Sequence, residues 1–313
     1  MEGIISFGAY VPIYRLDRRI LGQVWGKEGE GEKAVANYDE DSLTMGVAAA
    51  RECLKGVRKE NIDALYFAST TPPFKEKQSA SIIAAALDLR EDIVSVDISN
   101  SLRGGTVAFR LALDAVKAGN ARYSLVVISD CRIPPPVSTF EPIFGDGAAA
   151  FLIGREEVAV EVRGSYYVTS EFIDVWRLEY DKLTRSWEDR FIREEGYMPH
   201  LQKAISALMK IHALTPKDFA KVAFYAPNEG LHKAMARSLG LDRAQIQDPL
   251  FNKLGNTGAA FAPMVLVGAL EEASPGDKIL LANYGDGADA HFLKVTDGIE
   301  KLKNKRSLKK NLQ

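Results

Sequence analysis

The sequence is poor in the residues that form disulfide frameworks and metal sites. It has two cysteines, Cys53 and Cys131, and four histidines among 313 residues. The two cysteines lie too far apart in the sequence to match a disulfide-rich scaffold or a zinc site, and the histidines show no metal-ligand spacing. The sequence therefore predicts no metal and no required cofactor, and it suits a reducing, cytoplasmic compartment.

The chain also lacks a long apolar run and an excess of one charge. No stretch reaches the roughly 18 apolar residues of a membrane span, and the N-terminus enters a strand pattern without the basic start of a signal peptide. The 40 basic and 42 acidic residues give a net charge of −2. We therefore expect neither a membrane nor a nucleic acid as partner.

Short apolar runs of strand length alternate with helix-length periodic segments along the whole chain. This alternation is typical of an α/β fold in which both faces of the sheet are buried. We expect strands at 4–11, 64–69, 93–98, 124–129, 148–153, 158–168, 222–226, 278–282 and 288–295. We expect helices at 43–54, 79–87, 106–118, 201–211, 231–239 and 257–270, the last with Asn256 as its N-cap.

Two similar glycine turns indicate an internal duplication. FGDGAAAFLI (144–153) and YGDGADAHFL (284–293) each precede the final strand of one half of the chain. They precede strands rather than helices, so their glycines, Gly287 among them, favour tight turns and close backbone approach near a site over phosphate binding. We predict pseudo-duplicated α/β halves at 1–156 and 157–297, with an insertion near 170–200 in the second half.

Two charged segments leave alternatives open. The stretch 183–195, LTRSWEDRFIREE, is either an amphipathic surface helix or a lid or entrance wall of a ligand tunnel. The basic tail 298–313 is either a frayed, solvated end or a docking segment for another subunit.

The segment DISNSLRGGT (97–106) has the outline of a nucleophile elbow. It lies between an apolar strand and a helix, and such a turn lifts one side chain to the top of a sheet. The helix that begins near Gly104 would aim its N-terminal N–H groups and dipole at developing negative charge. Arg103 could hold a carboxylate or phosphate there, or could be a solvated or interface arginine.

Several segments carry a family resemblance, and they span nearly the whole chain: GIISFGAYVPIYRL, KQSASIIAAALDL, NSLRGGT, TSEFIDVWR, GNTGAAFAP and NYGDGADAHF. Together they resemble the thiolase superfamily and, within it, the 3-hydroxy-3-methylglutaryl-CoA (HMG-CoA) synthases. The resemblance implies two pseudo-duplicated halves in a layered α-β-α-β-α fold. It also implies a CoA thioester as ligand, and a homodimer or thiolase-family heteromer paired through 93–98.

The resemblance also implies where catalytic groups should lie, and this chain departs at those positions. The family uses a cysteine that is acylated by acetyl-CoA, a glutamate that deprotonates the acetyl group, and a histidine. Leu102 stands at the cysteine position, Thr70 at the glutamate position and Tyr225 at the histidine position. Asn256 matches the asparagine that helps to polarise the thioester. A low-pKa thiolate and a base near the carbon acid are therefore both missing.

Other residues could take over part of the chemistry. Ser101 is next to the elbow position but has no histidine motif near it to act as base. Cys131 is either a buried structural thiol or a moved nucleophile beside Asp130 and Arg132. Tyr225 could donate a hydrogen bond to a thioester oxygen or could simply fill space. The candidate catalytic residues are therefore Asn256, Tyr225 and Ser101, with Arg103, Gly104 and Gly287 as candidate substrate contacts.

Four functions remain open from the sequence. The first is a non-catalytic subunit that assembles with a thiolase and a small zinc-ribbon/OB-fold protein, for which the family gives precedent. The second is an acyl-CoA acyltransferase or C–C condensing enzyme that works without a covalent cysteine intermediate, with Asn256, Tyr225 and the helix dipole at Gly104 polarising the thioester. The others are an active HMG-CoA synthase with an unrecognised nucleophile and an unrelated ligand-binding role.

Overall fold

A nine-stranded mixed sheet runs through the molecule. The computed structural model describes residues 1–26, 29–305 and 307–312. The strand order is β11-β12-β13-β8-β1-β7-β6-β4-β5, and two short two-stranded sheets, β2-β3 and β9-β10, lie outside it. The strands are β1 Gly3–Tyr10, β2 Tyr14–Asp17, β3 Glu32–Val35, β4 Ile62–Ala68, β5 Val94–Ile98, β6 Tyr123–Asp130, β7 Gly147–Gly154, β8 Val160–Thr169, β9 Val175–Trp176, β10 Arg185–Ser186, β11 Lys221–Phe224, β12 Lys278–Tyr284 and β13 Gly287–Val295.

The helices confirm the expected pattern to within a few residues at most ends. They are α1 Arg18–Trp25, α2 Ser42–Cys53, α3 Ser79–Ala86, α4 Gly104–Lys117, α5 Asp189–Phe191, α6 Met198–Ile211, α7 Glu229–Ser238, α8 Phe261–Leu270 and α9 Ser307–Asn311. Short 3-10 helices lie at Lys59–Asn61, Pro216–Asp218, Gly258–Ala260 and Asp297–Leu302, and a π-helix at Ile192–Tyr197. None of the helices in the described parts of the chain is both long and apolar enough to cross a membrane.

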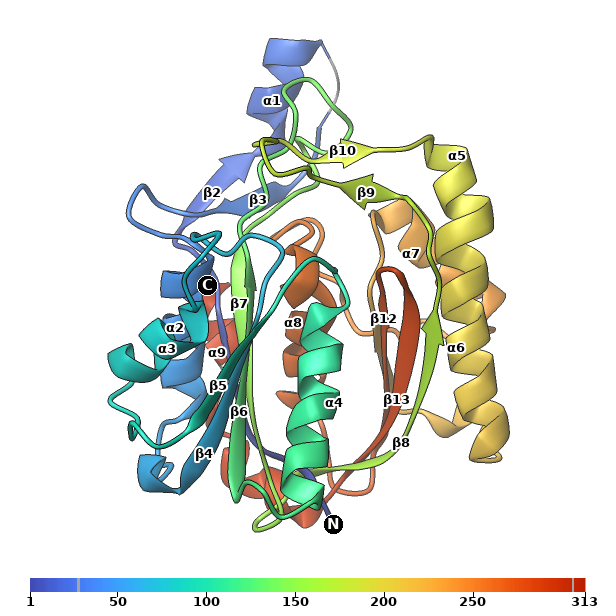
Figure 1. Cartoon of the computed structure of the whole chain (residues 1–313). Helices are drawn as coiled ribbons and strands as arrows, with labels where there is room; N and C mark the ends of the chain where they lie inside the picture. The colour runs from blue at the N-terminus through green and yellow to red at the C-terminus, as the bar shows by residue number, and fades with distance from the viewer. Residues whose placement is uncertain (27–28, 306, 313) are drawn as a thin grey trace.

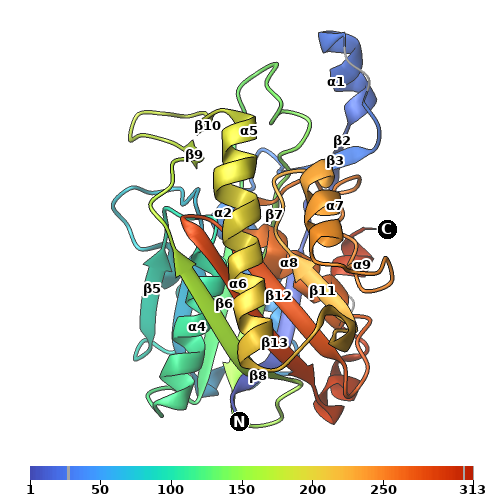
Figure 2. The ribbon, with the colours of Figure 1, turned by 90° about the vertical axis from the view of Figure 1, so that its right-hand side faces the viewer.

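The elements form five layers, which confirms the expected α-β-α-β-α arrangement. Figure 1 shows α2 and α3 outside the β5-β4-β6-β7-β1 part of the sheet, with α4 and α8 on its inner side. The β8-β13-β12-β11 part follows, and α6 and α7 cover its outer side (Figure 2). All ten residues of α8 are buried, as expected of a helix that is apolar all round and lies between two sheet faces.

The two parts of the sheet join at one end only. β1 pairs with β7 along most of its length but meets β8 only through Gly3 and Ile4. Each part ends in an antiparallel pair, β6-β7 and β12-β13, so the two glycine turns occupy corresponding places. The division into halves after residue 156 stays a prediction.

The expected N-cap at Asn256 is wrong. The chain forms a 3-10 turn at Gly258–Ala260, and α8 begins only at Phe261. Gly258 has a left-handed φ of 62°, so the backbone turns before the helix can start. Asn256 still accepts a hydrogen bond from the Gly258 N–H at 3.0 Å, but its amide group reaches residues far away in the sequence.

The segment predicted as an insertion near 170–200 does not form one amphipathic helix over 183–195. Its first part is a small hairpin in which β10 pairs with β9, and the helix starts at Asp189. The helix continues through the π-helical segment into α6. Its charged first turns lie beside a cavity, so the alternative of an entrance wall fits the observed position.

The basic tail packs against the protein instead of remaining solvated. Leu308 is 2% exposed, and the Ser307 hydroxyl accepts a hydrogen bond from the backbone N–H of Ala9 at 2.9 Å. The Lys305 ammonium donates to the carbonyl of Cys53 at 2.7 Å. Arg306 and Gln313, which belong to the predicted tail, lie outside the described residues.

We expect the Leu308→Ala substitution to lower the free energy of unfolding by about 2 kcal/mol, because it removes a buried side chain and leaves a cavity beside α8. Urea unfolding followed by circular dichroism measures this loss. The Ile211→Ala variant is the control, since Ile211 is 63% exposed at the end of α6 and should change stability by less than about 0.5 kcal/mol. Equal losses in the two variants would show that the tail does not stabilise the fold.

Candidate functional site

The predicted elbow is present, and a leucine stands at its tip. β5 ends at Ile98 and α4 begins at Gly104, whose N–H donates to the Ser101 carbonyl at 2.9 Å. Asn100 adopts a left-handed φ of 70° in the turn between them. Leu102 is 6% exposed and lines a cavity. The elbow therefore places a hydrocarbon side chain where a nucleophile would be needed for covalent acyl transfer.

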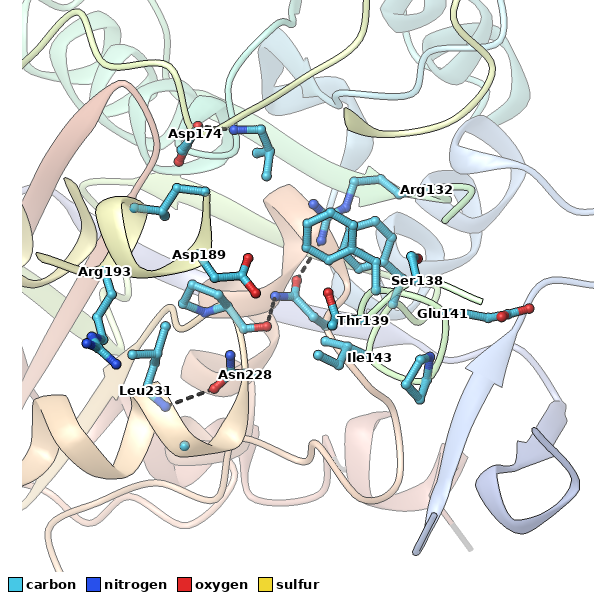
Figure 3. A pocket seen from close by; sticks show the side chains of 18 of the residues that line it. Arg132, Ser138, Thr139, Glu141, Ile143, Asp174, Asp189, Arg193, Asn228 and Leu231 are labelled. Atoms are coloured by element: carbon cyan, nitrogen blue, oxygen red, sulfur yellow. Dashed lines mark hydrogen bonds between the residues drawn. The ribbon is translucent and has the colours of Figure 1, made fainter. Parts of the chain in front are cut away.

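The cavity has a volume of about 850 Å³, within the range usual for small-molecule sites. Its walls come from α1, the loop after β6, the segment 188–193, and the start of α7 (Figure 3). Exposed side chains such as Trp25, Val137 and Arg193 form its mouth. Its inner end is formed by buried residues: Leu102, Arg132, Phe144, Asp174, Tyr225, Asn256 and Tyr284.

Asn256 lies at the inner end with its hydrogen-bonding capacity in use. Its Oδ1 accepts from the Arg132 guanidinium at 2.8 Å and from the Gly258 N–H at 3.0 Å. Its Nδ2 donates to the carbonyls of Ala226 at 3.1 Å and Pro227 at 3.2 Å. Two donors face Oδ1 and two backbone acceptors face Nδ2, so the orientation of the amide is unambiguous. The amide donors are therefore not free to polarise a thioester in this arrangement.

Tyr225 is 3% exposed and lies against Asn256. Its hydroxyl accepts from Asn256 Nδ2 at 3.3 Å, and its ring makes an edge contact with Phe261. Burial raises the pKa of the phenol, although Arg132 and Asn256 beside it act in the opposite direction. Tyr225 therefore remains a neutral hydroxyl that fills the inner wall.

Thr70 and Ser101 do not line the cavity. The Thr70 hydroxyl donates to Asp130 at 2.9 Å, and its backbone N–H donates to the same carboxylate at 2.7 Å. The Ser101 hydroxyl accepts from the Arg103 N–H at 3.3 Å, and no basic side chain in the described chain is bonded to it. Neither hydroxyl is paired with the base that a serine or threonine nucleophile needs.

The three predicted substrate contacts also lie outside the cavity lining. The Arg103 guanidinium turns toward the sheet and donates to the carbonyls of Val168 at 3.2 Å and Ala288 at 3.3 Å. Gly104 opens α4 among buried neighbours. Gly287 begins β13 in close approach to β8, where a Cβ would lie 2.0 Å from the Val168 carbonyl. A role for these residues in substrate binding stays a prediction.

The environment of Cys131 does not favour a moved nucleophile. Burial raises the pKa of its thiol far above the ordinary value, and Asp146 beside it acts in the same direction. Burial likewise raises the pKa of the Asp146 carboxyl. Because the thiolate is the reactive form, Cys131 has the character of a structural thiol. Among the residues the structure describes, no group of three His, Cys, Asp or Glu side chains could hold a metal ion.

The sequence reasoning missed two charged residues of the inner end, Arg132 and Asp174. Asp174 belongs to the motif TSEFIDVWR, and its carboxylate accepts the Val175 N–H at 2.5 Å. Burial raises the pKa of Asp174, although hydrogen bonds from Val175 and from the Tyr284 hydroxyl oppose the shift. Arg132 lies two residues after the end of β6, and a single arginine after a buried strand was the only signal in the sequence.

Comparisons with known proteins agree with this architecture. The family model described as 3-oxoacyl-[acyl-carrier-protein] synthase III matches residues 96–170, and the model of its C-terminal part matches 209–292. A hydroxymethylglutaryl-CoA synthase of Methanopyrus kandleri is 33% identical over 98% of this chain and 91% of its own length. The enzyme of the same name from Aeropyrum pernix is 37% identical over 96% of this chain and 87% of its own length.

Solved structures show the same fold. A crystal structure of an HMG-CoA synthase complexed with CoA has a TM-score of 0.90 at 20% identity, covering 99% of this chain and 86% of that one. The 3-oxoacyl-[acyl-carrier-protein] synthase III from Aquifex aeolicus has a TM-score of 0.85 at 22% identity, covering 94% of this chain and 100% of that one.

Proposed function

Because the chain belongs to the hydroxymethylglutaryl-CoA synthase family, we propose that it binds an acyl-CoA in the cavity without forming a covalent acyl-enzyme. It would serve as a non-catalytic subunit of an acyl-transfer complex. The observation that carries this proposal is Leu102, a buried leucine at the tip of an intact elbow. A turn, helix N-terminus and cavity without a nucleophile favour binding over covalent catalysis.

The neighbouring groups support the same proposal. Thr70 is held by Asp130, and Tyr225 is a neutral phenol within the Asn256 network. Neither provides a base near a bound acyl group. The alternative is a condensing enzyme that polarises the thioester through Asn256. The bonds that Asn256 makes to the carbonyls of Ala226 and Pro227 weigh against that alternative.

A partner of the thiolase type would supply the missing cysteine. β5 is an edge strand of the large sheet, and its Val94 and Val96 side chains are 59% and 37% exposed. Leu111 on the neighbouring helix α4 is 42% exposed. An edge strand with exposed apolar side chains favours pairing with another chain, either a second copy or a thiolase-family partner. A small zinc-ribbon/OB-fold protein would complete the proposed complex.

The test is the intact mass of the protein after separate incubation with acetyl-CoA and acetoacetyl-CoA. We expect no acyl adduct on the wild-type chain, because none of the described residues that line the cavity is an activated nucleophile. Equilibrium dialysis with the same thioesters should show reversible binding. A stable adduct that maps to Ser101 or Cys131 would overturn the proposal.

The Leu102→Cys variant is the matched control. Its thiol would lie at the N-terminus of α4, where the helix dipole favours the thiolate. We expect iodoacetamide to alkylate this variant faster than the wild-type chain, which shows that the elbow is reachable from the cavity. If the variant reacts no faster, the cavity does not lead to the elbow and the proposed binding mode is wrong.

A further inference from the structure

The inner end of the cavity contains a buried positive charge that no acid among the described residues pairs with. Arg132 is 7% exposed and lines the cavity at its inner end. In the described part of the chain it makes no ion pair, and its Nε–H has no hydrogen-bond partner. Burying a cation is costly unless it is paired or fully hydrogen-bonded.

The groups around Arg132 satisfy it only in part. Its Nη2 donates to Asn256 Oδ1 at 2.8 Å, and the Tyr225 hydroxyl lies beside it. Its Cζ lies 3.9 Å from the centre of the Phe144 ring, so an aromatic face covers one side of the guanidinium plane. Its Nε–H is left without an acceptor among the described residues.

A second arginine of the same cavity shows how this chain satisfies a buried guanidinium with its own atoms. Arg18 is 9% exposed, and its Nε donates to the Pro142 carbonyl at 2.7 Å. Its remaining nitrogens donate to Asn252 Oδ1 at 3.1 Å, to the Glu30 carbonyl at 3.3 Å and to the Phe251 carbonyl. Arg132 has no such set of acceptors.

The buried acid at the inner end, Asp174, makes no ion pair with Arg132 among the described contacts. The Asp174 carboxylate is occupied by Val175 and by the Tyr284 hydroxyl. Figure 3 shows Asp174 and Arg132 on different sides of the cavity. The acidic residues Glu188 and Asp189 are exposed and lie on the segment that leads to the mouth.

We infer that the cavity takes an acyl ligand whose carboxylate binds Arg132 at the inner end. A guanidinium edge accepts a carboxylate through paired hydrogen bonds. Apolar side chains, among them Leu21, Ile143 and Leu231, contribute to the cavity wall beside polar and charged ones, and they suit a hydrocarbon chain. The carboxylate could belong to a free aliphatic acid or to the far end of a carboxyacyl-CoA, and both present the same chemistry to Arg132.

This inference rests on the proposed function, because it assigns a ligand class to the same cavity. The test is the shift in thermal unfolding midpoint of the full chain with two matched probe pairs: octanoate against octanamide, and glutaryl-CoA against valeryl-CoA. Each pair differs in the carboxylate and little in length. We expect the carboxylate member of at least one pair to bind about tenfold tighter or more than the member without the carboxylate. Calorimetric titration measures both affinities directly.

Three variants assign that preference to Arg132. Arg132→Gln keeps a donor for Asn256 but no charge, and we expect it to lose the preference. Arg132→Lys should retain part of it. Arg155→Met is the control, because Arg155 lies outside the cavity lining and is paired with Glu2 at 3.0 Å. We expect its preference to stay within about twofold of wild type.

The outcomes separate the two proposals. Binding of both members of each pair with equal affinity, or a preference that survives in Arg132→Gln, overturns the inference and leaves the proposed function standing. If no probe binds at all, both fail. Inorganic phosphate, which lacks an apolar chain, should not raise the unfolding midpoint. If phosphate stabilises the protein as much as octanoate does, and this effect depends on Arg132, the site is a general anion site and the inference is wrong. The pair that shows the preference identifies the source of the carboxylate.

Discussion

Replacing Asp130 by alanine should lower the free energy of unfolding by about 4 kcal/mol, because it leaves several buried donors without an acceptor. Asp130 is the last residue of β6 and is fully buried. Its carboxylate accepts from the Ser69 hydroxyl at 3.0 Å, the Thr71 hydroxyl at 3.1 Å and both donors of Thr70. It also accepts the Ala259 N–H at 2.7 Å.

These bonds connect two separate parts of the fold. The residues 69–71 follow β4, whereas Ala259 belongs to the 3-10 turn that leads into α8. The carboxylate also lies near the N-terminal end of that helical segment, where a negative charge is favourable. The Asp130→Ala variant should therefore lose both the loop geometry after β4 and the start of α8.

Urea unfolding of wild type and variant measures this loss. Asp130→Asn should lose less than Asp130→Ala, because the amide still offers one acceptor. Asp92→Ala is the matched control, since the Asp92 side chain is 77% exposed and pairs with Arg90 at the surface. It should change stability by less than about 0.5 kcal/mol. A loss below about 1 kcal/mol in Asp130→Ala would contradict the structural role given to this carboxylate.

The second large effect concerns pH and His232. His232 is 3% exposed on α7, and its ring stacks on Phe224 of β11 with centroids 4.1 Å apart. Burial lowers the pKa of His232 to about 4; Glu229 nearby raises it in part, and Lys233 lowers it further. In the unfolded chain the imidazole titrates near 6.5.

The sign of the effect follows from which state binds the proton. Between pH 6.5 and pH 4 the unfolded chain protonates His232 and the folded chain does not. The free energy of unfolding therefore falls as the pH decreases, by about 2 kcal/mol at pH 5 and about 3 kcal/mol near pH 4. Above pH 6.5 this contribution is fully present and constant.

Unfolding of wild type and His232→Phe across this pH range isolates the contribution, because all other groups titrate in both proteins. Phenylalanine keeps a ring against Phe224 but binds no proton. We expect the free energy of unfolding of wild type, minus that of the variant, to decrease by about 3 kcal/mol from pH 7 to pH 4. Parallel pH curves for the two proteins would show that His232 is accessible to protons in the folded state.

The sequence predicted the main elements of the fold because their signals are local. Period-two and period-3.6 patterns identified the long strands and helices, and the observed ends of β5 and α4 lie within two residues of the expected ones. Asn256 was misread as a helix cap because a polar residue before an apolar run is a typical N-cap. Its actual partners, at residues 225–227 and Arg132, come together only in the folded chain.

The candidate site was predictable only in part. The resemblance placed Leu102, Tyr225 and Asn256 in one region, and all three line the same cavity. Ser101 and Arg103 were predicted as site residues because they flank the elbow position. Their side chains instead form hydrogen bonds with the backbone around the elbow. Arg132 was not predicted as a site residue because its role depends on the lack of an acidic partner among the described residues. That surrounding is built from segments far apart in the sequence, so it can be seen only in the folded chain.

The bonds at Thr70 also bear on how this chain could change over evolutionary time. A cysteine at position 102 would place a thiol at the elbow by one substitution, but a glutamate at position 70 would bring a second carboxylate beside Asp130, which already accepts the hydroxyl of Thr70 at 2.9 Å. Two adjacent carboxylates would resist ionising together. A nucleophile and a base at these two positions would thus require coordinated replacements, because a glutamate at position 70 would also remove the hydroxyl that Asp130 now accepts.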